Sequence, residues 1–351
     1  MNKNIILYGA GFCGAMFLEL LQAEGERPQC FFDQKKAGSL EGIPIRKPCK
    51  IAEMTDASIV VCMLEKGSLY EEIRNNLKNL GYEDIVHIYD LKDKKLFEDQ
   101  KVIILPKKEI VEGKMEHFKT MCERLKDKTS KKLLDQVVDS ILDQKIAVEK
   151  NAPIQEQYLA YDIFTHNEEE VFVDCGAFKG EVLEAFIEKN KKFKRYICIE
   201  ADEKYLPFLE QKKKQYDCVQ IEIKKAALSD QVEEKFIKNY AMEDSILSEK
   251  GDRRVDTVPL DQLMQDEEIT FLKIDVEGME KKVLEGAKNE IIKNRPIIAV
   301  ATYHYETEFY ELFEWIENLD LQYDFFLRSY MNIQEIVLYA VPKERWVKNI
   351  Q

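Results

Sequence analysis

The sequence contains no long hydrophobic run and no excess of basic residues. No apolar stretch approaches the roughly 18 residues that would span a bilayer. The N-terminus lacks the apolar core and small-residue cleavage site of a signal peptide. The chain carries 52 basic and 66 acidic residues, a net charge of −14. Binding to nucleic acid or to an anionic membrane needs a basic face. We therefore expect a cytoplasmic protein with no membrane span and no nucleic-acid partner.

Closely spaced cysteine pairs are also missing. The chain has eight cysteines, and no two of them stand within four positions of each other. This spacing excludes the usual paired zinc motifs. Five of the eight lie in or beside apolar runs that look like strands. Buried, reduced thiols in a cytosolic protein are the simplest interpretation.

The chain is longer than one ordinary domain core, and its apolar pattern divides it into three parts. Residues 1–95 alternate strand-like and helix-like stretches, which predicts a small doubly wound domain. Residues 96–156 are charged and helical in period. We interpret them as a helical connector rather than a solvated linker, because the stripe Leu133–Leu142 would otherwise expose an apolar face. Residues 157–351 resume the alternation. The expected fold is α/β, with two doubly wound, Rossmann-like domains joined by a helical connector.

The first domain carries a glycine motif between a predicted strand and a predicted helix. Its glycines are Gly9, Gly11 and Gly14, and Asp33 ends the second strand. An acid about 20 residues beyond the last glycine is the usual ribose partner in a dinucleotide site. The region is only half a full dinucleotide domain, and it resembles the small nucleotide-sugar-binding domains of sugar-modifying enzymes, including the segment Gly42–Ile45. Nucleotide or nucleotide-sugar binding, a structural domain and NAD use all stay open.

A second glycine turn follows the apolar run 171–175. The turn reads Asp174-Cys-Gly176-Ala177-Phe178-Lys-Gly180. Glycines let the backbone approach a ligand, and the helix that follows offers unpaired N–H groups. In an open α/β sheet such a turn borders the ligand crevice at the carboxyl ends of the strands. Asp174 can pair with a cationic part of the ligand there.

The next predicted strand ends on an acid. Glu200 closes the run 196–200 and is followed by Ala201 and Asp202. A carboxylate at this point can accept both hydroxyls of a ribose, in charge-assisted bonds of about 1.5–3 kcal/mol each. The alternative is a surface acid that caps the next helix. Asp202 fits the capping role better, and we count Ala201 and Asp202 with Glu200 among the candidate cofactor-binding residues.

Residues 157–342 resemble the FkbM-type S-adenosylmethionine-dependent O-methyltransferases. The resemblance rests on ordered blocks at 173–180, 200–202, 226–230, 258–263, 271–280 and 295–304. It implies S-adenosylmethionine as cofactor and methyl transfer to an oxygen, often of a sugar, polyketide or other secondary metabolite. It also implies that Ala227 and Leu228 border the adenine. Two strand candidates after the last helix agree with it, because methyltransferase sheets finish with an antiparallel pair.

Three residues are the candidate catalytic groups. Asp275 follows the apolar run 271–274 and should also face the methyl donor, and Glu277 lies in the turn into the next helix. His304 ends the next strand, beside Asp275, and its tyrosine neighbours are unusual for the family. An imidazole is a natural base for removing a proton from an attacking hydroxyl. His304 as a packing residue and Glu277 as a helix cap are the alternatives. We expect no metal ion in the site. The alternative is a metal-assisted mechanism in which all three residues bind the ion.

The leading function is an O-methyltransferase that acts on a hydroxyl of a sugar, glycan precursor or related small metabolite. The rival is a non-catalytic, nucleotide-binding scaffold in polysaccharide biosynthesis, and a third is an oxidoreductase built on the first domain. Glu200 together with the turn at Asp275 favours the first. The expected partners are a small-molecule or glycan acceptor and a nucleotide or nucleotide-sugar at the first domain. The acceptor's identity and the oligomeric state stay open.

Overall fold

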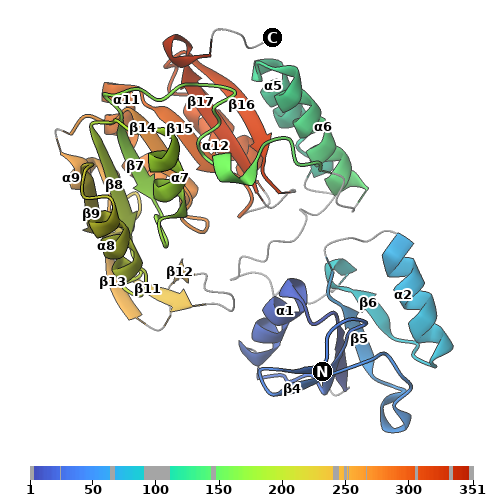
Figure 1. Ribbon diagram of the computed structural model, residues 1–351. Coiled ribbons are helices and arrows are strands. Elements are labelled where there is room, and N and C mark those ends of the chain that lie inside the picture. Colours follow the sequence, from blue (N-terminus) through green and yellow to red (C-terminus); the bar gives the residue numbers. More distant parts are fainter. Residues whose placement is uncertain are drawn as a thin grey trace. The chain divides into compact units, whose positions relative to one another are not determined.

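The computed structural model describes most of the chain. The described residues are 4–23, 25–63, 68–90, 111–143, 148–239, 245–248, 251, 253–265, 267–304, 307–331 and 335–347. The chain divides into two compact units, each described here by itself (Figure 1). The first comprises residues 1–109, 140–146 and 240–243, and the second comprises 110–139, 147–239 and 244–351. No described helix is long and apolar enough to cross a membrane.

The first unit is a six-stranded sheet with a helix on each face. Its strands are β1 (Ile5–Tyr8), β2 (Cys30–Phe32), β3 (Gly38–Leu40), β4 (Ile43–Arg46), β5 (Ser58–Val61) and β6 (Ile85–His87), in the order β3-β4-β2-β1-β5-β6. The β3–β4 pair is antiparallel and the other pairs are parallel. Two 3-10 turns accompany them, η1 (Ala52–Met54) and η2 (Ile88–Asp90).

The helices of this unit pack against opposite faces of its sheet. Alternate residues of a strand point to opposite faces. Ile5 and Leu7 share a buried cluster with helix α1 (Phe12–Ala23). Ile6 and Tyr8 share another with helix α2 (Ser68–Asn79). The unit is therefore doubly wound, and the predicted fold class is confirmed.

The main sheet of the second unit has seven strands. They are β7 (Val171–Cys175), β8 (Arg195–Glu200), β9 (Ile221–Lys225), β14 (Phe271–Ile274), β15 (Ile297–Ala301), β16 (Tyr323–Ser329) and β17 (Ile336–Pro342), in the order β16-β17-β15-β14-β7-β8-β9. The first five in sequence pair in parallel, whereas β17 runs antiparallel to both β15 and β16. The predicted antiparallel ending is confirmed.

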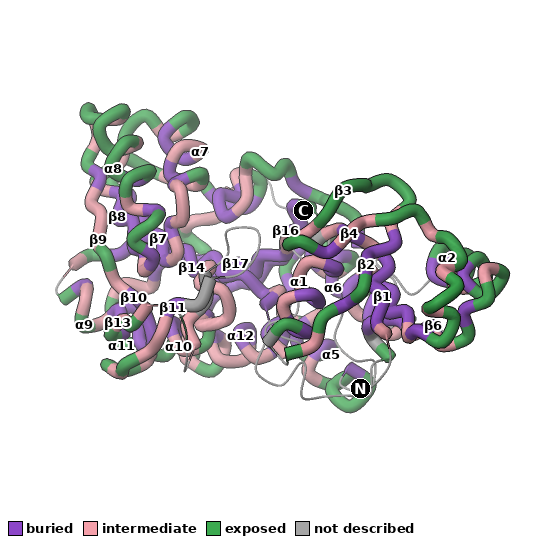
Figure 2. Tube along the Cα trace, turned by 90° about the horizontal axis from the view of Figure 1, so that it is seen from below, coloured by how far each residue is buried: buried purple, intermediate pink, exposed green. Residues whose placement is uncertain are grey.

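Helices cover both faces of this sheet as well. Phe326 of β16 packs in a core cluster with residues of α7 and α8, and its neighbour Phe325 packs on Phe313 of α12. Successive strand residues face opposite ways, so α7 and α12 lie on opposite faces. The central strands are accordingly buried throughout (Figure 2). The helices are α7 (Glu181–Lys189), α8 (Leu206–Gln215), α9 (Leu260–Met264), α10 (Glu280–Gly286), α11 (Lys288–Asn294) and α12 (Glu308–Glu317), with 3-10 turns η3 (Ile154–Glu156) and η5 (Lys343–Arg345).

A small second sheet is inserted after β9. It contains β10 (Ala227–Leu228), β11 (Glu234–Asn239), β12 (Ser245–Ser248) and β13 (Arg253–Val258), in the order β10-β13-β11-β12. The sequence predicts a hairpin of 233–239 with 253–258, and β11 does pair antiparallel with β13. It gives no sign of β12, which pairs with the other edge of β11. Four residues are too few for a clear alternation of apolar and polar side chains.

Two helices precede the main sheet, α5 (Met115–Arg124) and α6 (Lys128–Leu142). The apolar stripe of α6 is buried, including Leu133, Val137 and Ile141. Between the helices, Asp127 bonds Arg328 of β16. Residues 96–110 and 144–147 of the predicted connector lie outside the described residues. The boundaries that we place at 95/96 and 156/157 stay predictions.

Candidate active site

The turn after β7 requires glycine at two positions. Gly176 has a φ of +83°, and a Cβ on it would lie 1.8 Å from the carbonyl oxygen of Asp275. The backbone segments that follow β7 and β14 therefore lie so close together that no Cβ fits between them at Gly176. Gly180, with a φ of +81°, precedes α7. Ala177 and Phe178 lie between them, so the predicted turn stands at the carboxyl end of β7, beside the end of β14.

Asp174 contributes to a buried ionic network under this turn. One of its carboxylate oxygens lies 2.9 Å from Nζ of Lys273, and the other accepts a 2.8 Å bond from the hydroxyl of Tyr196. Lys273 also donates to the carbonyl oxygen of Gly176 at 2.7 Å. Burial disfavours the charge on Lys273, but Asp174 and Asp275 outweigh burial and raise its pKa. In this arrangement Asp174 holds the turn in place, and its pairing with the cofactor stays a prediction.

Glu200 is fixed at the end of β8 by two backbone N–H groups. Its carboxylate oxygens accept 2.8 Å bonds from the N–H of Phe178 in the glycine turn and from that of Asp202, which follows Ala201. Burial raises the pKa of Glu200. Each carboxylate oxygen retains a lone pair beyond these bonds. The side chain is thus held in one orientation with acceptor capacity left over, which suits the predicted ribose contact.

Asp202 does not cap helix α8. The helix begins at Leu206, and Tyr205 occupies the capping position without a side-chain bond. Asp202 is buried instead, and it accepts bonds from the N–H of Lys204 at 3.1 Å and from Arg253 of β13 at 2.9 Å. The capping prediction is wrong, because the chain makes a turn between Asp202 and the helix. Asp202 instead joins the end of β8 to the inserted sheet.

The third strand end adjoins the same region. The N–H of Ala226 donates to the carbonyl oxygen of Glu200 at 3.1 Å, and Ala227 and Leu228 form the short strand β10. Both are almost fully buried. This places them beside Glu200, where the family resemblance puts the adenine. Their contact with adenine stays a prediction.

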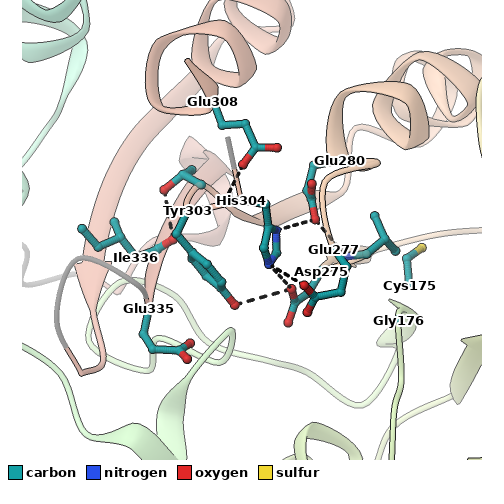
Figure 3. A network of polar contacts seen from close by, with 12 residues as sticks. Cys175, Gly176, Asp275, Glu277, Glu280, Tyr303, His304, Glu308, Glu335 and Ile336 are labelled. Atoms are coloured by element: carbon teal, nitrogen blue, oxygen red, sulfur yellow. Dashed lines mark hydrogen bonds and ion pairs between the residues drawn. The ribbon is translucent and has the colours of Figure 1, made fainter. Parts of the chain in front are cut away.

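Three acids surround His304 at the ends of β14 and β15 (Figure 3). Its Nδ1 lies 2.9 Å from a carboxylate oxygen of Glu280, the first residue of α10. Its Nε2 lies 3.4 Å from an oxygen of Glu277 and 3.7 Å from one of Asp275. The backbone N–H of His304 donates to Glu308 at 2.8 Å. The sequence brings Asp275, Glu277 and His304 together, and the structure does so too.

The charge state of His304 does not suit a base. Burial alone would lower its pKa, but Glu280, Glu277 and Asp275 outweigh burial and raise its pKa to about 10. Both ring nitrogens lie within ion-pair distance of carboxylates, which favours the charged ring. The imidazole is therefore protonated at neutral pH and has no lone pair with which to take a proton. The structure argues against the predicted base role and supports a role as a fixed cation among the acids.

A row of polar groups continues from Asp275 to Glu335. The hydroxyl of Tyr303 lies 3.5 Å from Asp275 and 3.3 Å from the hydroxyl of Tyr158. Glu335, the residue before β17, accepts a 2.5 Å bond from the side-chain amide of Gln157. Figure 3 shows the Glu335 carboxylate near the Tyr303 hydroxyl, on the side of Asp275. Burial and the charge of Asp275 raise the pKa of Glu335 to about 7, although Gln157 and His304 act to lower it.

The spacing of this cluster also bears on metal binding. The candidate ligand atoms of Asp275, Glu277 and His304 lie within 4.8 Å of one another, as do those of Glu280, His304 and Glu308. Carboxylates with an imidazole can bind a divalent cation. The imidazole would have to lose its proton first, which the surrounding acids disfavour. Our expectation of no metal stays a prediction.

Comparison with known protein families identifies the type of domain that contains this region. Residues 174–327 match the model of the methyltransferase FkbM domain. Residues 174–327 therefore form a methyltransferase FkbM domain. The matched residues include the Glu200 strand end, the Asp275 turn and His304. The protein is therefore an S-adenosylmethionine-dependent methyltransferase.

Solved structures agree on the fold. A methyltransferase FkbM from Methylobacillus flagellatus KT matches with a TM-score of 0.71 at 20% identity, over 97% of this chain and 90% of that chain. This likeness therefore includes the first unit. An rRNA methylase from Streptococcus thermophilus matches over 55% of this chain and 97% of that chain, with a TM-score of 0.34 at 15% identity, too weak to support an argument. A comparison with curated proteins found no match.

In the first unit, the glycine motif forms hydrogen bonds with side chains of the same unit. Asp33 accepts a 2.9 Å bond from the N–H of Ala10, and the side chain of Lys36 donates to the carbonyl oxygen of Ala10 at 2.7 Å. A Cβ on Gly14 would lie 1.9 Å from the carbonyl oxygen of Gly9, whereas one on Gly11 would meet nothing within 4 Å. Gly9 and Gly14 thus serve backbone packing, and Gly11 borders open space. Nucleotide binding here stays a prediction.

Sequence reasoning missed several polar groups of the methyltransferase site. Lys273 interrupts the apolar strand 271–274. A charged residue in a buried strand needs a partner of opposite charge nearby, and this could have pointed to the site. Glu280 could have been chosen from its helix position, one turn after Asp275. Glu335 has no comparable signal, because it lies far along the chain from the groups it faces.

Proposed function

We propose that this FkbM methyltransferase transfers a methyl group to a hydroxyl of a sugar, glycan precursor or related small metabolite. The observation that carries the proposal is the polar group of Asp275, Glu277, Tyr303, His304 and Glu335 beside the turn that follows β7. Hydroxyl, carboxylate and imidazolium groups together can orient an acceptor that carries several hydroxyls.

The residues around the turn suit S-adenosylmethionine. Glu200 presents a fixed carboxylate at the strand end next to the glycine turn. Asp275 and Glu277 lie at the next strand end and favour the cationic sulfonium. When bound, the cofactor supplies an electrophilic methyl group. The protein aligns donor and acceptor, and this alignment can lower the barrier substantially.

The test follows a labelled methyl group. Dialysed protein is first titrated with S-adenosylmethionine by calorimetry, and we expect saturable binding at micromolar concentration. The protein is then incubated with the trideuteromethyl cofactor and a panel of UDP-glucose, GDP-mannose, methyl α-glucoside and glycerol. Mass spectrometry should find a deuterated methyl ether in at least one polyol. Cofactor binding with methylation only of amines or thiols would contradict the proposal. Binding of panel members without turnover would favour the scaffold.

We propose further that the first unit binds a nucleotide or nucleotide-sugar. The full chain is titrated with UDP-glucose and with NADH, and we expect heat from the first ligand. A matched variant is Gly11→Asp, because Gly11 has room for a side chain and a carboxylate there would repel a phosphate. We expect it to lose at least tenfold in UDP-glucose affinity and to keep its S-adenosylmethionine affinity. If neither ligand gives a saturable binding signal, the result would favour a purely structural role for the first unit. A signal from NADH alone would favour the oxidoreductase alternative.

A further inference from the structure

Methylation of a hydroxyl releases a proton, and the carboxylates around His304 favour a ring that already carries its proton. Its Nδ1 faces Glu280 at 2.9 Å, and its Nε2 faces Glu277 at 3.4 Å. Carboxylates at both nitrogens favour the doubly protonated, cationic ring. If the proposed O-methylation is correct, the proton must therefore pass to another group near the ends of β14 and β15.

We propose that Glu335 is the general base that receives the acceptor's hydroxyl proton. Glu335 lies directly before β17, and its backbone carbonyl accepts a 3.0 Å bond from the N–H of Tyr330, which fixes the start of the strand. The side-chain amide of Gln157 donates to one carboxylate oxygen at 2.5 Å. Figure 3 shows the carboxylate near the Tyr303 hydroxyl, on the side of Asp275.

The other carboxylates of the site are bound differently. Asp275 and Glu277 both lie within ion-pair distance of the His304 ring, and Asp275 also faces the Tyr303 hydroxyl. Glu280 is fully buried behind the ring. The Glu335 carboxylate accepts a hydrogen bond from the neutral amide of Gln157 rather than lying in ion-pair contact with the ring.

The groups that face Glu335 adjust its basicity to neutral pH. They come from three segments: Asp275 at the end of β14, Tyr303 and His304 after β15, and Gln157 ahead of β7. Burial raises the pKa of Glu335, the like charge of Asp275 raises it further, and the other three lower it, giving a pKa of about 7. A base is most effective when its pKa lies near the working pH.

With Glu335 as the base, every bond, electron pair and proton of the methyl transfer is accounted for. The acceptor oxygen uses a lone pair to form the C–O bond as the C–S bond breaks, and the electron pair of that bond stays on sulfur. The sulfonium becomes a neutral thioether. The O–H proton passes to the Glu335 carboxylate, which then releases it to solvent. No oxidant, reductant or further reactant is needed.

The first experiment needs no acceptor. Protein labelled with ¹³C at the glutamate carboxyl carbon is titrated by NMR, and Glu335→Gln identifies the signal of interest. We expect one carboxyl with a midpoint near pH 7 that is absent from the variant. A midpoint below about 5 for this signal would overturn the proposal, whether or not any hydroxyl is methylated.

The second experiment measures turnover with the most active hydroxyl compound of the panel above, with EDTA present throughout. Glu335→Gln should lower kcat by about 10²- to 10⁴-fold and leave the S-adenosylmethionine Kd within about threefold. For the wild type, kcat/KM should fall about tenfold per pH unit below pH 7, and the variant's profile should be flat. Glu335→Asp should restore part of the rate.

A matched control separates this role from a general charge effect. Glu344→Gln removes an exposed acid nine residues later, which pairs with Arg295 at 2.5 Å, and it should keep the wild-type profile. A Glu335→Gln variant with wild-type rate and an unchanged acidic limb would overturn the proposal. A wild type that methylates no hydroxyl would instead contradict the proposed function, and the NMR midpoint would still report on Glu335.

Discussion

Replacing Glu200 with glutamine is expected to weaken S-adenosylmethionine binding by about 10²- to 10⁴-fold, the equivalent of two charge-assisted hydrogen bonds of about 1.5–3 kcal/mol each. The carboxylate accepts from the N–H groups of Phe178 and Asp202. An amide keeps one acceptor oxygen and turns its NH₂ group toward one of these donors. The side chain must then rotate, and its orientation toward the ribose is lost.

Calorimetric titration of both proteins measures this effect. Glu203→Gln is the matched control, because Glu203 lies three residues later, is half exposed and pairs with Lys225 and Arg253 on the surface. It should bind the cofactor as the wild type does. Thermal melts of the two variants show whether any loss at position 200 reflects unfolding. A folded Glu200→Gln protein with a Kd within threefold of wild type would remove Glu200 from the cofactor site.

Much of this fold follows from local sequence pattern. Buried parallel strands appear as short apolar runs between glycine turns and helices, and these runs predict both sheets. The turn at Gly176 and the acid at Glu200 could be found because each directly follows such a run. The meeting of Asp275 with His304 also follows, since adjacent parallel strands end at the same edge. Each of these inferences needs only the order of neighbouring elements.

Contacts between distant segments could not be predicted in this way. Gln157 and Glu335 are 178 positions apart, and their hydrogen bond depends on the register of β17 against β15. The charge of His304 depends on Glu280 from a helix that the sequence places nearby but does not orient. An isolated imidazole suggests a base. The same imidazole with carboxylates at both nitrogens is a cation, and only three-dimensional proximity distinguishes the two.

Replacing Arg328 with leucine is expected to destabilise the second unit by about 3–5 kcal/mol, because it leaves a buried aspartate without its partner. The Arg328 guanidinium lies 2.6 Å from Asp127 and also bonds Asp162 at 2.7 Å. Burial alone would raise the pKa of Asp127, but Arg328 and Ser130 outweigh burial and lower it. Urea denaturation at neutral pH followed by tryptophan fluorescence measures the loss.

The same substitution on an exposed pair gives the control. Arg254→Leu removes a partner of Glu234 at the surface, where the ion pair contributes less than about 1 kcal/mol. The pH dependence separates the charge effect from lost packing. A lowered carboxyl pKa stabilises the fold above the ordinary aspartate value of 3.8 and ceases to do so as pH falls through the folded value. The gap between wild type and Arg328→Leu should therefore shrink in acid, where Asp127 of the variant becomes protonated. A gap that stays constant down to pH 4 would mean that the Arg328 side chain stabilises the fold by packing rather than by its charge.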